Sequence, residues 1–150
     1  MARNNLSSTI PESLAKLRHL RVLDLSNQIS QGGQGIFGRL IDFSHNLELS
    51  QVYLPGNALS GTIPSYLFGR SPISTDLIID LRGNSLTGTI PSELRRFDKI
   101  NILLADNRIE AISDKFCYKS LWMMGDVDDF GCVSYEIICP RNSHMKYMST

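Results

Sequence analysis

Residues 57–64 read Asn-Ala-Leu-Ser-Gly-Thr-Ile-Pro, and residues 84–91, which begin 27 positions later, read Asn-Ser-Leu-Thr-Gly-Thr-Ile-Pro. A third copy at residues 4–11 reads Asn-Asn-Leu-Ser-Ser-Thr-Ile-Pro. A phrase that returns at such a spacing is typical of a solenoid, in which each copy belongs to one turn. The chain has 150 residues, which is enough for several turns around one core.

A short alternation of apolar residues precedes the phrase. Its clearest form is Leu49-x-x-Val52-x-Leu54, and related pairs occur at residues 23 and 25, 79 and 81, and 102 and 104. Period-two alternation predicts a short, half-buried strand. We also predict a ladder of buried amides that bond backbone groups of adjacent turns, formed by Asn4, Asn57, Asn84 and Asn107. A single turn cannot bury its apolar face alone, so the turns must stack.

The repeated pattern LxxLxLxxNxLSGxIPxxL covers roughly residues 4–112 and resembles the plant-type leucine-rich repeat. The resemblance implies an α/β solenoid, a right-handed superhelix with a short-stranded parallel concave sheet and irregular or helical convex turns. It also implies a second, shorter strand layer near each Ser-Gly-x-Ile-Pro. We therefore expect residues 1–112 to form about four repeats, of which the first is partial.

Residues 40–46 allow two placements. They resemble an additional concave strand with its own asparagine, but the next alternation follows too soon for a complete parallel crossover. The spacing of Ile36, Leu40 and Phe43 equals that of residues 90, 94 and 97. This second alignment favours the convex side for residues 40–46. Asn27 then sits one position too early for the ladder, so we expect an irregular turn there.

A Gly-rich insertion at residues 29–38 enlarges this repeat and contains a GxGxxG match at residues 33–38. A dinucleotide fingerprint also requires a following helix and an acidic residue within a βαβ unit. Neither fits a repeat insertion, so we interpret the match as part of the insertion. The three histidines are scattered and no zinc or EF-hand spacing occurs, so we expect no metal and no cofactor.

The repeat pattern stops after residue 112, and all three cysteines follow it. We predict a cysteine-containing cap at residues 113–140 and a mobile tail at residues 141–150. The end resembles the cysteine-bearing caps of secreted repeat proteins, in a form like that of diatom leucine-rich repeat proteins. Cys132–Cys139 and Cys117–Cys132 are both plausible disulfides, and the spacing does not choose between them.

Composition and motifs exclude several function classes. The 15 basic and 15 acidic residues balance, which gives no global attraction to nucleic acid. No apolar run is long enough for a membrane span, and the polar first residues do not resemble a signal peptide. No catalytic motif occurs, so we predict that the chain is not an enzyme. The chain enters the solenoid in mid-repeat, and we expect it to be part of a longer secreted or cell-surface protein.

The remaining candidate is the displayed surface of the concave strands. We predict a non-catalytic recognition module that binds a protein or peptide there. The proposed contact residues are Asp24, Gln51, Tyr53, Ile78, Asp80, Arg82, Asn101 and Leu103. Tyrosine and arginine often anchor interfaces, and the charged members can select a partner. The alternative is a structural or adhesive segment of a secreted or wall-associated protein, because the first turn lacks a cap.

Overall fold

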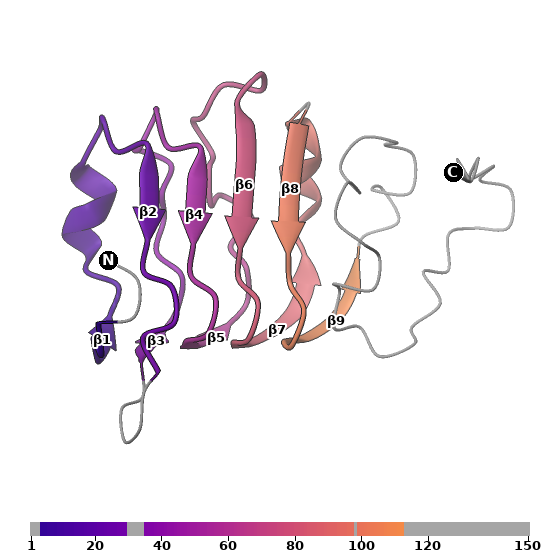
Figure 1. Ribbon diagram of the computed structural model, residues 1–150. Helices are drawn as coiled ribbons and strands as arrows, with labels where there is room; N and C mark the ends of the chain where they lie inside the picture. Colours follow the sequence, from indigo (N-terminus) through magenta and orange to yellow (C-terminus); the bar gives the residue numbers. More distant parts are fainter. Residues whose placement is uncertain (1–3, 30–34, 98, 113–150) are drawn as a thin grey trace, which may run out of the picture.

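The computed structural model describes residues 4–29, 35–97 and 99–112, and it is a solenoid of parallel strands with two sheets (Figure 1). The front sheet has the order β2-β4-β6-β8 and contains Val22–Asp24, Gln51–Tyr53, Asp76–Asp80 and Lys99–Leu103. The second sheet has the order β1-β3-β5-β7-β9 and contains Ser8–Thr9, Ile36–Gly38, Ala58–Gly61, Ser85–Ile90 and Arg108–Ile112. The front sheet is the one expected on the concave side, and the second layer implied by the resemblance is present.

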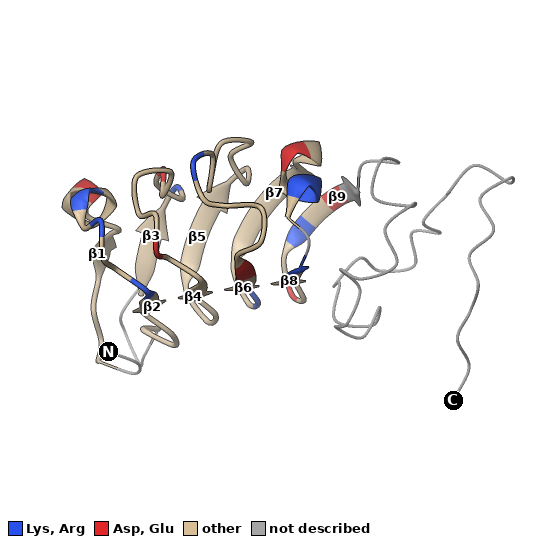
Figure 2. Cartoon of the chain, turned by 90° about the horizontal axis from the view of Figure 1, so that it is seen from above, with Lys and Arg blue, Asp and Glu red and all other residues tan. Residues whose placement is uncertain are grey.

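The segments that return from the second sheet to the front sheet form the back of the molecule (Figure 2). Two of them contain short 3-10 helices, η1 at Glu12–Lys16 and η2 at Ser92–Arg96. Each follows a proline in extended conformation, which presets the backbone for one tight turn. The described residues are otherwise mostly strand, which corrects the expectation of an α/β class.

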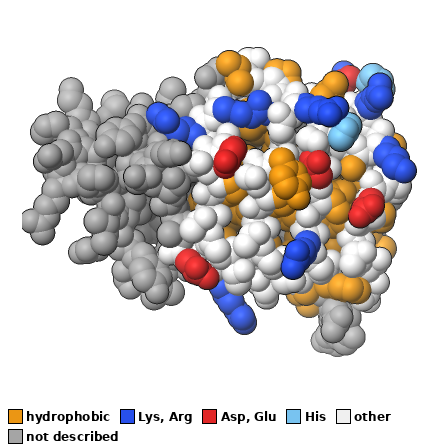
Figure 3. Space-filling model, turned by 180° about the vertical axis from the view of Figure 1, so that it is seen from behind, with side chains coloured by type: hydrophobic (Ala, Val, Ile, Leu, Met, Phe, Trp, Pro, Cys, Tyr) orange, Lys and Arg blue, Asp and Glu red, His pale blue; other side chains and the backbone are white. Residues whose placement is uncertain are grey.

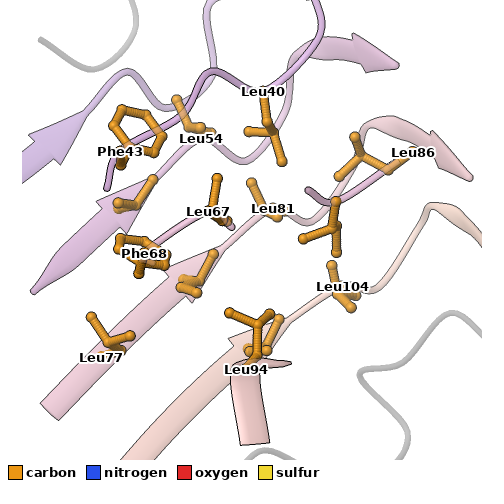
Figure 4. Close-up of a cluster of buried hydrophobic side chains, with 14 of the residues drawn as sticks. Leu40, Phe43, Leu54, Leu67, Phe68, Leu77, Leu81, Leu86, Leu94 and Leu104 are labelled. Carbon is orange, nitrogen blue, oxygen red and sulfur yellow. The ribbon is translucent and has the colours of Figure 1, made fainter. Parts of the chain in front are cut away.

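Alternation along the strands explains the core. Leu23, Val52, Ile79 and Ile102 align across the front sheet, and all are buried. Figure 4 shows that leucines from successive turns, such as Leu54, Leu67 and Leu81, meet in the space behind this sheet. These three side chains are 0%, 1% and 0% exposed, so each turn completes the core of its neighbour.

Three phenylalanines continue the core along the back. The ring centroids of Phe43 and Phe68 lie 6.2 Å apart in a stacked arrangement. Those of Phe68 and Phe97 lie 6.4 Å apart, edge to face. Both separations are typical of favourable aromatic pairs. Arg96 covers the end of the row, with its guanidinium carbon 4.5 Å from the Phe97 centroid.

Side-chain amides join consecutive turns. Asn84 Nδ2 donates to the carbonyls of Leu54 and Leu81, each at 2.9 Å, and its Oδ1 accepts the Leu59 N–H at 3.0 Å. Asn57 and Asn107 make the same three kinds of bond, to their own turn and the preceding one. These bonds satisfy backbone groups that bend away from the strands and would otherwise be buried without partners.

In the first full turn the equivalent position holds Gln28, which the sequence analysis missed. Gln28 is fully buried, and its Oε1 accepts the N–H groups of Asn4 and Leu6 at 3.0 and 3.2 Å. The backbone N–H of Asn4, in the first turn, thus donates to the side-chain amide of Gln28 in the next turn. Asn27, one residue before this ladder position, has a different role. It occupies a left-handed backbone position, with φ of 52°. Its equivalents Gly56 and Gly83 have φ of 61° and 62°, a region that favours glycine and asparagine.

Residues 40–46 belong to neither sheet, and Phe43 N donates to Leu67 O on the back at 3.1 Å. The predicted placement is thus confirmed, but the alignment behind it was wrong. Ile36 N donates to Asn57 as Leu59 N does to Asn84, so Ile36 corresponds to Leu59. Leu40 consequently takes the place of the phrase's isoleucine. The insertion lies between Gln28 and Ile36, which are eight positions apart, whereas Asn57 and Leu59 are two apart.

The predicted cap at residues 113–140, the tail at 141–150 and the candidate disulfide residues Cys117, Cys132 and Cys139 lie outside the described residues.

Replacing Asn84 with alanine is expected to lower the free energy of unfolding by at least about 2 kcal/mol, because the Leu59 N–H and two carbonyls lose their partner in the core. Urea denaturation with an unchanged slope measures this. Ser85→Ala, one position along and exposed, is the control and should change little. A loss below about 0.5 kcal/mol for Asn84→Ala would show that the ladder does not hold the turns together.

Candidate protein-interaction surface

The strand register places the predicted contact residues in two rows on the front sheet. Val22, Gln51, Ile78 and Asn101 align in one row, and Asp24, Tyr53, Asp80 and Leu103 align in the next. Arg82 follows β6 by two residues and lies beyond the second row. The parallel register therefore brings seven of the eight predicted residues to one face, as the alternation of side chains along a strand requires.

Asp80 and Arg82 form an ion pair within their own turn. Arg82 Nε donates to Asp80 Oδ1 at 3.0 Å, and Nη2 donates to Oδ2 at 2.8 Å. The Arg82 N–H also donates to Oδ1, at 3.2 Å. The Asp80 side chain is only 6% exposed, whereas that of Arg82 is 43% exposed. Asp80 thus orients the guanidinium through a two-point contact and is itself withdrawn from direct recognition. The sequence analysis treated the two charges separately and missed this.

Asp24 has a related arrangement with Ser26, which occupies the position equivalent to Arg82. The Ser26 hydroxyl and the Ser26 N–H both donate to Asp24 Oδ1. These two hydrogen bonds favour the ionised carboxylate and lower the pKa of Asp24. A negative charge therefore remains at the first-turn end of the second row under neutral and mildly acidic conditions.

Beside the Asp80–Arg82 pair, the middle of the surface has apolar area. Tyr53 and Ile78 are half-buried on adjacent strands, and the Tyr53 hydroxyl donates to Gln51 Oε1 at 3.2 Å. That hydrogen bond holds the ring of Tyr53 in one orientation on the sheet. An anchored tyrosine beside a half-buried isoleucine presents apolar area with little further loss of side-chain freedom on binding. The arrangement suits contact with another polypeptide better than bond-making chemistry.

The described residues do not provide the geometry of a metal site or of a dinucleotide-binding motif. No group of three or more histidine, cysteine, aspartate or glutamate residues that could hold a metal ion occurs within residues 4–29, 35–97 and 99–112. The GxGxxG match ends in β3, a strand of the second sheet, and the chain then continues along the back without a helix before β4. A dinucleotide fingerprint would open a helix at that point. The match is therefore part of a repeat.

Comparison with known families identifies one unit of this architecture. Residues 77–97 match the family model of the Leucine Rich Repeat. This leucine-rich repeat runs from β6 through β7 to the end of η2, and thus covers one full turn, including Asp80, Arg82 and Asn84. The match supports a leucine-rich repeat protein and suggests a protein-interaction module, since such repeats are typically non-enzymatic. No curated protein matches the chain. None of the helices in the described residues is long and apolar enough to cross a membrane.

Replacing Ser26 with alanine is expected to raise the pKa of Asp24, because the hydroxyl bond to the carboxylate is lost and only the backbone bond remains. A carboxyl group with a depressed pKa stabilises the fold above its unfolded pKa and loses that contribution as the pH falls through the folded pKa. The variant should therefore lose less stability on acidification than the wild type. NMR titration of the Asp24 carboxyl carbon measures the pKa, and an unchanged value would contradict the assignment.

Proposed function

We propose that this chain is a non-catalytic recognition module that binds a protein or peptide on its front sheet. The observation that carries the proposal is the anchored Tyr53 beside Ile78, at the centre of two aligned rows of outward side chains. Arg82, held by Asp80, adds a fixed cation beside this apolar centre. Aromatic and arginine side chains at the centre of a contact surface contribute most of the binding energy in typical interfaces.

The proposed setting is a longer secreted or cell-surface protein. Two features support it: the resemblance to plant-type repeats, and three cysteines gathered after residue 116. Disulfides are stable in oxidising extracellular compartments, so a cysteine-containing end suits that location. The partner is then expected among extracellular proteins.

The test compares a half-buried side chain of the front sheet with an exposed apolar side chain outside both sheets. Tyr53→Ala is expected to weaken partner binding by about 30-fold or more, the cost typical of losing a central aromatic anchor. Ile73→Ala removes an apolar side chain that is 55% exposed outside both sheets and should leave binding unchanged. The wild type is first used to capture partners from separate extracellular and cytosolic fractions, and the affinity of each purified partner is then measured for both variants.

Arg82→Ala is a poor variant for this test, because it leaves the buried Asp80 carboxylate without its cation and destabilises the fold. If Tyr53→Ala binds the captured partner as well as the wild type does, the front sheet is not the binding surface. Capture only from the cytosolic fraction would refute the extracellular setting.

A second candidate function, structural end-to-end association, rests on the edge of the first turn. Leu6 and Leu17 are 37% and 48% exposed, whereas their equivalents Leu59 and Phe97 are 0% and 1% exposed. The edges of β1 and β2 also have no neighbouring strand within the described residues. Exposed strand edges flanked by apolar side chains favour addition of a further strand.

If association uses this edge, the sedimentation coefficient of the chain should rise with protein concentration, and Leu17→Glu should abolish the rise. The reason is that a charge placed at this apolar position would be buried on association. Ile73→Glu, on an exposed residue away from the edge, is the matched control. A constant coefficient for the wild type would exclude this candidate function.

A further inference from the structure

The back of the molecule contains an open groove between the first two turns, on the face shown in Figure 3. Its volume is about 1030 Å³, which is larger than a small ion needs and matches the upper range of ligand sites. One wall comes from β1 and η1, the other from residues 39–45, and Tyr66 of the third turn lies at its border. The groove is on the opposite side from the front sheet, so this inference is independent of the proposed function.

The second turn departs from the repeat where it lines this groove. Thr9, Thr62 and Thr89 directly precede the buried isoleucine of the phrase, whereas the second turn has Arg39 before Leu40. The stem of Arg39 packs on Gly61, since a Cβ added to that glycine would lie 3.3 Å from Arg39 Cγ. The scaffold accepts a threonine at this position in three other turns, so the fold does not require an arginine.

The apolar part of the lining is also specific to this place. Ile41 stands where the other turns have the proline of the phrase, and it is half-buried. Tyr66 stands where the last full turn has Glu93 and the first has Ser13, and 58% of it is exposed. Neither the segment between β3 and β4 nor the one between β5 and β6 contains a 3-10 helix, whereas η1 precedes them and η2 follows. Ile41 and Tyr66 therefore form an accessible apolar border beside Arg39.

The charges of the lining are unpaired. Lys16, Arg18 and Arg39 line the groove, together with Glu12 and Asp42. Among residues 4–29, 35–97 and 99–112, none of these five groups forms an ion pair. Asp42 Oδ1 already accepts the Ser44 N–H at 2.7 Å, which uses part of its capacity. The cations thus exceed the acids and are available to a ligand.

We propose that this groove binds an extended acidic peptide segment, whose carboxylates pair with Arg39 and Lys16 and whose apolar side chain packs on Tyr66 and Ile41. Three unpaired cations favour an anionic ligand. Glu12 and Asp42 would repel a uniformly charged polyanion, which favours acids separated by uncharged residues. A peptide offers this spacing, because successive side chains of an extended chain alternate in direction.

The test is selection from a phage-displayed library of random 12-residue peptides on the immobilised chain, followed by synthesis of the enriched peptides. We expect enrichment of peptides with at least two acidic residues and one apolar residue. Arg39→Thr, which installs the residue of the other turns, should weaken a selected peptide at least about tenfold, and Tyr66→Ala should weaken it similarly. Affinity should fall as the salt concentration rises.

Two matched controls locate the site. Arg70→Thr removes an exposed cation outside the groove, and Ile73→Ala removes an exposed apolar side chain outside it; both should leave the peptide affinity unchanged. The proposal is overturned if no peptide is enriched, if the enriched peptides lack acids, or if Arg39→Thr binds as tightly as the wild type. Equal displacement by heparin at the same charge concentration would overturn the assignment to a peptide.

Discussion

The structure depends on buried side-chain amides that bond across consecutive turns. Each asparagine satisfies a carbonyl of its own turn and both a carbonyl and an N–H of the turn before it, at the bend where the front strand ends. Strand pairing alone would leave these backbone groups in an apolar interior, at a cost of about 1–3 kcal/mol each. These bonds join only neighbouring turns, so each turn fixes the strand register of the next one. The alignment of the outward-facing rows on the front sheet follows from that register.

The front sheet and the back differ in how strictly the repeat fixes the positions of their side chains. On the front, strand register forces side chains into rows, and one pair, Asp80 and Arg82, uses that geometry to hold a cation in place. On the back, the return segments differ in length and local structure, and a groove lies between the first two turns. The phenylalanine row and the two amide donors of Asn46, which bond Leu14 O and Leu17 O at 2.8 and 2.7 Å, keep this variable face attached.

Sequence reasoning predicted the strands, the rows and the back position of residues 40–46, because period-two alternation and repeat spacing report burial directly. It missed Gln28, although this residue follows Leu25 by the same interval at which Asn57 follows Leu54, since only asparagine was sought. It misaligned Ile36 because the spacing of Ile36, Leu40 and Phe43 equals that of residues 90, 94 and 97, although Ile36 corresponds to Leu86. The groove was not predicted, since it depends on the path of the return segments and on where side chains such as Arg39 and Tyr66 lie, which no periodicity encodes.

The insertion between Gln28 and Ile36 has one more consequence. Six extra residues stand there relative to the third turn, yet Gln28 still bonds the turn before it and Ile36 still donates to Asn57. Hydrogen bonds thus keep both flanks of the insertion in register with their neighbouring turns. The stacking of the repeats therefore accommodates six additional residues between the ladder position and the second sheet.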